Sequence, residues 1–349
     1  MTARTALSRL PHNPILSPAD IRFTEASGVF NAAATIDHAS GKVILLARVF
    51  ERDARRSCLA LAISSDGEHI DTVLDRPAMV PEAPYEAWGI EDPRITWLGD
   101  EGRYAVTYVG YSPAGPRVCL MTTEDLLDPK RYRRHGPRIE GENKNAMVFP
   151  EKIGGRYLVL HRPLPDIVLA EVARLEDPWP TGGERLIGPV DGSWRSARVG
   201  AGAPPERTRI GWLLPFHGAT TVPEGNVYSM GWCVLDGDDP RRVRHVTQEP
   251  ALVPEAPYEI EPGPLPQVDM QNFPRGVRVV FPEGMVLRGT RRIVYYGAGD
   301  VSVAAAYVDE DTLLDALSSE PADCHGDTET GARRNEFSVS ALRVSVPPW

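Results

Sequence analysis

The stretch NAMVFPEKIGGRYLVLHRP, residues 145–163, shows the pattern that decides the fold. Two apolar runs flank the turn signal Gly154-Gly155, and the second run ends in the polar residue Arg162. Short apolar runs joined by a glycine-containing turn are typical of a β-hairpin. The stretch therefore predicts two adjacent antiparallel strands with a polar end.

The same layout recurs four more times along the chain. The other copies span residues 29–49, 90–111, 200–219 and 279–300. A third β-like run follows each hairpin, over residues 58–67, 118–128, 167–177, 227–240 and 301–314. The segment VPEAPYE also occurs twice, at residues 80–86 and 253–259, which supports a common ancestry of the units.

Five strand-rich units predict an all-β fold, specifically a five-bladed β-propeller. A β-sandwich with many hairpins is the alternative, whereas the intervals are too short for the crossovers of a parallel α/β sheet. We expect residues 1–317 to form one five-bladed domain, in which residues 1–28 wrap the outside or complete a blade. We expect residues 318–349 to form a polar connector and a C-terminal edge strand or tail.

Composition limits the possible partners and compartments. The formal net charge of −10 argues against a nucleic-acid partner or an anionic membrane surface. No run is long and apolar enough for a signal peptide or a membrane span, so we expect a cytoplasmic protein. The cysteines Cys58, Cys119, Cys233 and Cys324 form no CxxC pair, and the first three lie in apolar runs. We therefore expect buried free thiols rather than a zinc site or disulfides.

Polar residues cluster where the predicted strands begin and end. The innermost strands of a propeller line a central channel, so their ends are natural ligand contacts. The cations Lys144, Arg162 and His217 come from two units, and Asp92 from a further one. Taken singly, each could be a solvated cap or a hydrogen-bonded core residue. Their recurrence at equivalent places favours an anion site beside a general acid.

Five motifs in the same order resemble glycoside hydrolase family 130. They are VFNAAA, GIEDPR, NKNAMVFPEKIGGRYLVLHRP, RVGAGAPPERTRIGWLLPFHG and VVFPEG followed by YYGAGD, from about residue 13 to residue 309. That family comprises mostly inverting β-mannoside phosphorylases, with some β-mannosidases, on a five-bladed propeller. The resemblance implies cleavage of a β-mannoside disaccharide or oligosaccharide by inorganic phosphate, giving α-mannose 1-phosphate and a shortened acceptor. It implies no other cofactor and no metal, and homo-oligomers are common in the family.

The resemblance also assigns roles to single residues. It makes Asp92 the general acid, acting through the 3-hydroxyl of the sugar, and we expect burial to raise the pKa of Asp92 so that it keeps its proton. The implied phosphate-binding residues are Lys144, Arg162, His217 and Arg198. The implied sugar-binding residues are Asn31, Arg48 and Asp300.

Three points stay open. An inverting β-mannosidase would need a second carboxylate as base, for which Glu151 and Glu283 are candidates; a non-catalytic sugar-binding propeller is a third hypothesis. Ala32 and Asn145 depart from the residues usual in the family, and residues 261–278 could reshape the acceptor pocket. The aromatic residues Trp88, Tyr85 and Tyr258 either stack on an acceptor sugar or pack between blades.

Overall fold

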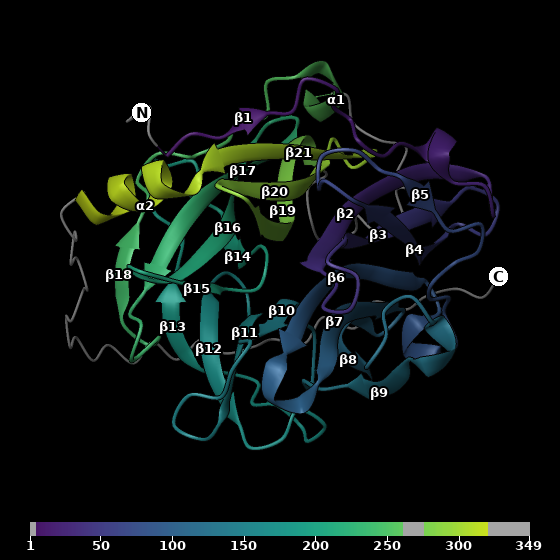
Figure 1. The fold of residues 1–349 in the computed structure, drawn as a ribbon, viewed down its shortest axis with the longest axis horizontal. Helices are drawn as coiled ribbons and strands as arrows, with labels where there is room; N and C mark the ends of the chain where they lie inside the picture. The colour runs from purple at the N-terminus through teal and green to yellow at the C-terminus, as the bar shows by residue number, and fades with distance from the viewer. Residues whose placement is uncertain (1–4, 261–275, 320–349) are drawn as a thin grey trace, which may run out of the picture.

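The computed structural model describes residues 5–260 and 276–319, and their fold is all-β, as predicted (Figure 1). By hydrogen bonding the described strands form three sheets, of eight, four and nine strands, and we describe them in chain order as five groups. The first group holds β2 (Ala26–Ile36), β3 (Val43–Glu51), β4 (Arg56–Ser64) and β5 (Thr72–Val73). The second holds β6 (Gly89–Leu98), β7 (Arg103–Ser112), β8 (Gly115–Thr123) and β9 (Arg133–Pro137). The third holds β10 (Lys144–Val148), β11 (Tyr157–Arg162), β12 (Ile167–Val172) and β13 (Glu184–Ile187).

The last two groups complete the described chain. The fourth holds β14 (Arg198–Ala201), β15 (Glu206–Thr208), β16 (Gly211–Val222), β17 (Gly225–Leu235) and β18 (Val243–Val246). The fifth holds β19 (Gly276–Arg288), β20 (Arg291–Ala298), β21 (Ser302–Asp309) and the N-terminal β1 (Ser8–Arg9). Short helices α1 (Pro257–Ile260) and α2 (Glu310–Ser319) and the 3-10 turns η1 (Pro18–Asp20), η2 (Pro84–Glu86), η3 (Gly99–Glu101) and η4 (Pro129–Arg131) connect them.

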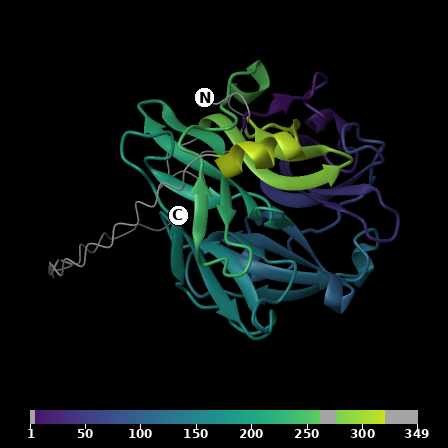
Figure 2. The same cartoon turned by 60° about the vertical axis from the view of Figure 1, so that its left-hand side comes forward.

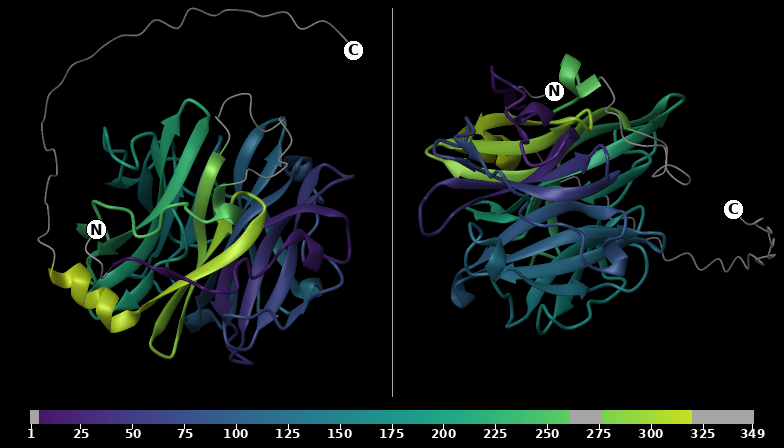
Figure 3. Two further views of the ribbon diagram at one scale, coloured as in Figure 1. Left: turned by 90° about the horizontal axis from the view of Figure 1, so that it is seen from above. Right: turned by 90° about the vertical axis from the view of Figure 1, so that its right-hand side faces the viewer.

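Strands within each group pair antiparallel, and the groups follow one another around the molecule. In Figure 1 they run clockwise from the purple first group at the right to the yellow-green fifth group at the top. Strand β2 packs against β6, β6 against β10, and β10 against β14. Strand β19 contacts β16 and β17 on one side and β2 on the other, so the fifth group meets the first. The views of Figure 3 show the same neighbours.

Apolar side chains fill each junction between neighbouring groups. One buried cluster joins the first two groups through Leu46, Leu61, Ile90 and Val106. Comparable clusters lie between the second and third, third and fourth, fourth and fifth, and fifth and first groups. Burial of apolar surface is the main favourable term in folding, so these junctions hold the groups together and fix the central strands.

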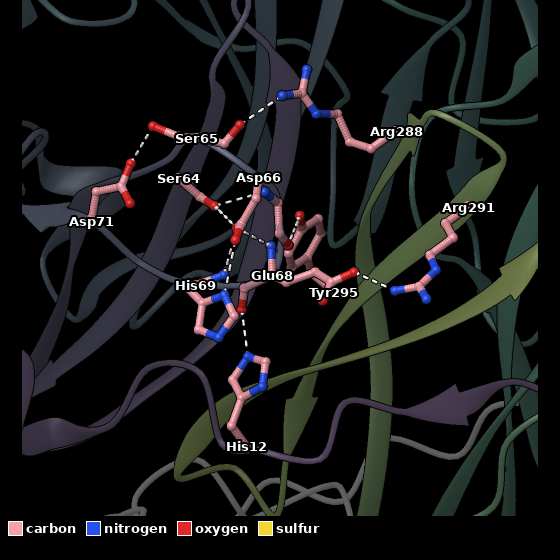
Figure 4. Close-up of polar contacts among 11 residues, drawn as sticks. His12, Ser64, Ser65, Asp66, Glu68, His69, Asp71, Arg288, Arg291 and Tyr295 are labelled. Atoms are coloured by element: carbon pink, nitrogen blue, oxygen red, sulfur yellow. Dashed lines mark hydrogen bonds and ion pairs between the residues drawn. The ribbon is translucent and has the colours of Figure 1, made fainter.

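The N-terminal segment completes the fifth group, which is one of the two roles expected for it. Strand β1 pairs antiparallel with β21, where Ser8 faces Tyr307. Polar contacts reinforce the seam between the fifth and first groups (Figure 4). Arg288 donates to the Ser65 carbonyl at 2.6 Å, and Arg291 binds the Glu68 carboxylate at 2.7 Å. Chain segments far apart in sequence thus meet here.

The duplicated VPEAPYE segment has the same structural role in both copies. Its last residue is a fully buried Glu that accepts hydrogen bonds from a Tyr on the second strand and an Arg on the outermost strand of one group. These partners are Tyr108 and Arg134 for Glu86, and Tyr296 and Arg9 for Glu259. Each Glu also binds two backbone N–H groups of its own loop. The two copies therefore share their hydrogen-bond contacts as well as their sequence.

The predicted β-like run over residues 301–314 is wrong in its second half. Strand β21 ends at Asp309, whose carboxylate accepts the Thr312 N–H at 3.0 Å and so begins helix α2. The buried Leu313, Leu314 and Leu317 have helical spacing, and α2 packs on β21 (Figure 2). Helix α2 crosses the proposed boundary at residue 317. The rest of the predicted connector and tail lies outside the described residues.

The cysteine prediction is confirmed where the structure describes it. Cys58, Cys119 and Cys233 are buried free thiols within strands, and burial raises the pKa of Cys58 and Cys119 to about 12. Cys324 lies outside the described residues. None of the described helices is long and apolar enough to cross a membrane.

Candidate active site

Backbone bulges place polar side chains on the innermost strands. Asn31, Asp92 and Asn145 have φ angles of 51°, 50° and 54°, and the pairing of their strands shifts register at each. A similar shift surrounds Glu283 in β19. Such bulges re-aim a side chain, and Asn and Asp tolerate the left-handed backbone better than most residues. In the sequence only Asn31, a single polar residue within the apolar run VFNAAA, signals such a bulge.

The predicted general acid lies in a buried polar cluster with two predicted sugar-binding residues. The Asn31 side-chain amide donates to Asp92 Oδ1 at 2.9 Å, and Arg48 Nη1 lies 3.4 Å from the same oxygen. Arg48 Nε also donates to Ser57 Oγ at 3.0 Å. All three predicted residues are buried. The structure thus brings the acid and these sugar-side residues together.

The pKa of Asp92 moves in the direction opposite to our expectation. Burial by itself raises the pKa of this carboxyl. The positive charges of Arg48, Lys144 and Arg94 act the other way and, with the amide hydrogen bond, hold the pKa below its ordinary value. The expected rise is therefore wrong for the protein without ligand, because cations surround the acid.

Glu91 connects the sugar side of the site to Lys144. Its carboxylate accepts from Arg48 Nη2 at 2.6 Å and from Lys144 Nζ at 3.0 Å. Lys144 was predicted to bind phosphate, and in the structure it shares the Glu91 carboxylate with Arg48. Glu91 is part of GIEDPR, but sequence reasoning had selected only its neighbour Asp92.

Arg94 of the same motif lies at the centre of the site and was also missed. Its guanidinium donates to the backbone carbonyls of Asp92 at 2.9 Å and Gly202 at 3.0 Å. Its Nη2 lies 2.9 Å from Glu283 Oε1, although neither Glu283 oxygen has hydrogen-bond geometry among the described residues. Arg94 therefore links the innermost strands of the second, fourth and fifth groups.

The remaining predicted phosphate-binding residues gather on the third and fourth groups. Arg162 ends β11, Arg198 begins β14, and His217 lies on β16. Arg198 donates to the Tyr228 hydroxyl at 2.5 Å. The buried Nε of Arg162 has no hydrogen-bond partner among the described residues. Burial, together with Arg198 and Arg94, lowers the pKa of Arg162 to about 10, so this pocket is short of negative charge.

His217 is neutral rather than cationic, which corrects the prediction that counted it among the cations. Burial and the neighbouring Arg162 and Arg94 hold its pKa well below the ordinary value. Its Nε2 lies 3.3 Å from the Asn145 amide nitrogen, and its buried Nδ1 has no partner among the described residues. A Cβ at Gly200 would lie 2.4 Å from the imidazole, so only glycine fits beside it.

The two candidate bases of the hydrolase alternative have different surroundings. Burial raises the pKa of Glu283 well above its ordinary value; Arg94 opposes this rise, and Asp92 adds to it. Burial therefore favours the protonated, neutral form of Glu283. Glu151 is about half exposed and pairs with Arg207 at 3.0 Å.

Asp300, the last predicted sugar-binding residue, lies in the turn after β20 with φ of 57°. Its Oδ2 lies next to Gly276, and its carbonyl lies next to Gly28 at the start of β2. Residues 276–278 of the expected connection belong to β19, and residues 261–275 lie outside the described residues.

A cavity of about 490 Å³ opens elsewhere, at the seam between the fifth and first groups. Its lining includes His12, Glu68 and His69, whose polar contacts Figure 4 shows. None of the predicted site residues lines it. Over residues 5–260 and 276–319, no three His, Cys, Asp or Glu side chains are arranged to hold a metal ion.

The innermost strands thus hold a buried carboxyl group among arginine side chains, and the relatives of the chain show that it is an enzyme acting on β-mannosides. The chain belongs to glycoside hydrolase family 130: the family model, described as beta-1,4-mannooligosaccharide phosphorylase, matches residues 7–319. It is 35% identical to 1,2-beta-oligomannan phosphorylase from Thermoanaerobacter sp. over 87% of this chain and 97% of that one.

Solved structures agree with this membership. The structure of beta-1,2-mannobiose phosphorylase from Listeria innocua, in complex with beta-1,2-mannobiose, has a TM-score of 0.75 and 30% identity, covering 90% of this chain and 99% of that one. Another, with TM-score 0.73 and 25% identity, concerns glycoside hydrolases of this family that target beta-1,2 mannosidic linkages in Candida mannan. It covers 88% of this chain and 94% of that one.

Proposed function

We propose that the protein is an inverting phosphorylase of β-mannosides and that its five strand groups are the blades of a propeller. In the reaction, a phosphate oxygen attacks the anomeric carbon of the terminal mannose from the face opposite the glycosidic bond. The bond to the acceptor oxygen breaks, and that oxygen receives a proton from Asp92, relayed by the sugar's 3-hydroxyl. The products are α-mannose 1-phosphate and a shortened acceptor.

The observation that carries the proposal is the excess of positive charge beside the acid. Arginine and lysine side chains at the site outnumber the carboxylates, and Glu283 is neutral. The cations are Arg48, Arg94, Lys144, Arg162 and Arg198, and the carboxyl groups are those of Glu91, Asp92, Glu283 and Asp300. A guanidinium can bind two phosphate oxygens at once, so Arg162 suits an anionic nucleophile.

A hydrolase of the same fold is the second candidate, because a structure similar to this chain concerns family hydrolases. An inverting hydrolase needs a base about 6.5–9.5 Å from the acid to activate water. Glu151 is bound to Arg207 on the surface, and Glu283 is buried and neutral. Neither environment favours a base, so phosphate remains the better-supported nucleophile.

The preferred linkage is proposed from the relatives. Three relatives with names specifying β-1,2-linked mannosides are 33–36% identical to this chain, and one acting on β-1,4-mannooligosaccharides is 30% identical. We take β-1,2-linked mannobiose and oligomannan as the first substrates. Inorganic phosphate is the co-substrate, and the proposed chemistry requires no other cofactor. The cytoplasmic location remains a prediction.

The deciding experiment supplies β-1,2- and β-1,4-linked mannobiose to the purified protein with and without phosphate. We expect phosphate-dependent formation of mannose 1-phosphate, with the α configuration in the NMR spectrum of the first product. An Asp92→Asn variant should lose about 10²- to 10⁴-fold in rate. Equal turnover without phosphate, giving only free mannose, would establish the hydrolase instead. Sugar binding without turnover by either protein would favour a non-catalytic role.

A further inference from the structure

Trp88 is an exposed aromatic side chain that lies four residues before Asp92 in the chain. Its side chain is 39% exposed, whereas the other large aromatic residues of the core are nearly fully buried. The other two candidates for sugar stacking are used in packing: Tyr85 contacts Gly110 and Gly136, and Tyr258 packs against a core cluster. Trp88 is the one of the three that offers a free face.

Tyr111 holds Trp88 in place. Its backbone N–H donates to the Tyr111 carbonyl at 2.8 Å, and the two rings meet edge to face with centroids 5.3 Å apart. Lys144 Nζ lies 5.4 Å from the centroid of the Tyr111 ring and 3.0 Å from Glu91. A continuous row of contacts thus connects the exposed indole to the interior of the site.

The position of Trp88 along the chain sets its distance from the acid. It immediately precedes β6, and four steps of extended backbone separate it from Asp92, about 10–13 Å. That is more than one sugar ring spans. Asn31, Arg48 and Asp92 are buried, so the mannose that is transferred lies at the inner end. An acceptor that leaves the site along this row of contacts extends outward, past Tyr111 and toward Trp88.

We propose that Trp88, supported by Tyr111, is a platform for the second sugar ring of the acceptor. This inference rests on the proposed phosphorolysis at Asp92. The apolar C–H face of a pyranose packs well on a flat indole, which offers a large apolar area with little loss of side-chain freedom. A disaccharide substrate has only one acceptor ring and does not reach the platform. The enzyme should therefore favour oligomannan over mannobiose.

The test compares Trp88→Ala and Trp88→Phe with the parent, using β-1,2-linked mannobiose, mannotriose and mannotetraose with phosphate. We expect the ratio of kcat/KM for mannotriose to that for mannobiose to fall about 10- to 100-fold in Trp88→Ala, mainly through KM. Trp88→Phe should recover part of the loss because it restores an aromatic face. The KM for phosphate should stay the same within error.

Leu287→Ala is the matched control, since it removes an exposed apolar side chain at the far end of β19. It should leave the ratio unchanged. An active parent whose Trp88→Ala variant keeps the same ratio overturns the platform but leaves the proposed function standing. A parent without phosphate-dependent turnover of any mannoside overturns both. Quenching of indole fluorescence by mannotriose in the parent, absent from Trp88→Phe, gives a readout that does not depend on turnover.

Discussion

Replacing Arg162 by methionine should make the protein without ligand more stable while removing its response to phosphate. Methionine is similar in length to arginine and apolar, so it fills the same space without the charge. Arg162 ends β11 with its Nε buried and unpartnered among the described residues, and burial with two neighbouring arginines lowers its pKa to about 10. The surroundings therefore destabilise the charged guanidinium of Arg162.

The size of the effect follows from that pKa. Each unit of pKa corresponds to 1.36 kcal/mol, so the lowered value implies a cost of about 3 kcal/mol for the charged form. Solvent at this partly exposed side chain should reduce the cost to about 1–2 kcal/mol. At neutral pH the guanidinium is protonated in both the folded and unfolded states, so the cost is fully present. We expect the melting temperature of Arg162→Met without phosphate to rise by about 2–4 °C.

Phosphate should reverse the order of the two proteins. A ligand at a hundred times its dissociation constant stabilises the folded state by about 2.7 kcal/mol. The parent should gain this stabilisation, and Arg162→Met should gain little. The KM for phosphate should rise about 10- to 100-fold in the variant, since charge-assisted hydrogen bonds are lost. Thermal melting across a phosphate titration, together with initial rates, measures both effects.

Arg162→Lys is the matched control because it keeps the charge and loses the two-pronged contact. It should show no gain in stability without phosphate and an intermediate KM for phosphate. The reasoning fails if Arg162→Met melts several degrees below the parent in phosphate-free buffer. It also fails if the variant keeps the parent's full stabilisation by phosphate.

Three further predictions follow from the buried carboxyl groups. Because cations lower the pKa of Asp92, the negative charge of bound phosphate should raise it. The pH at which mannoside turnover declines on the alkaline side should therefore increase with phosphate concentration. An alkaline decline that stays at the same pH would contradict this. Glu259→Gln should cost about 1–3 kcal/mol at neutral pH, because it removes the buried charge that pairs with Arg9, which keeps its hydrogen bond to the Val253 carbonyl. Since the folded-state pKa of Glu259 is lowered, the difference in stability between the parent and Glu259→Gln should disappear as the pH falls through that pKa and Glu259 is protonated. Equal melting temperatures of the two proteins at pH 7 would contradict the prediction. Glu283→Gln should change the free energy of unfolding by less than about 1 kcal/mol, because the parent is already neutral there; a loss of about 3–5 kcal/mol would show an ionised pair with Arg94.

Local chemistry in the sequence was sufficient to predict the strands and the candidate residues. Alternating apolar runs with glycine turns predict hairpins because strand periodicity and turn geometry depend on neighbouring residues. Asp92 was selected by its place in the recurring pattern, and Asn31 and Arg48 through the family resemblance; the structure brings the three into contact. The helix after β21 was missed because a strand and a short amphipathic helix can share one apolar run.

Contacts between residues far apart in the chain determine the strand pairing and the protonation states, which the sequence does not specify. The pairing of β1 with β21 closes the fifth group across the whole chain, and no local pattern specifies that partner. Protonation states are also tertiary properties: Asp92 is ionised by cations from other strands, and His217 is neutral through burial among them. The sequence by itself determined the strands and most of the candidate site residues, although it did not single out Glu91 or Arg94. Only the folded arrangement decided the charges of the site residues, since electrostatic energies depend on distances and burial that residue order does not contain.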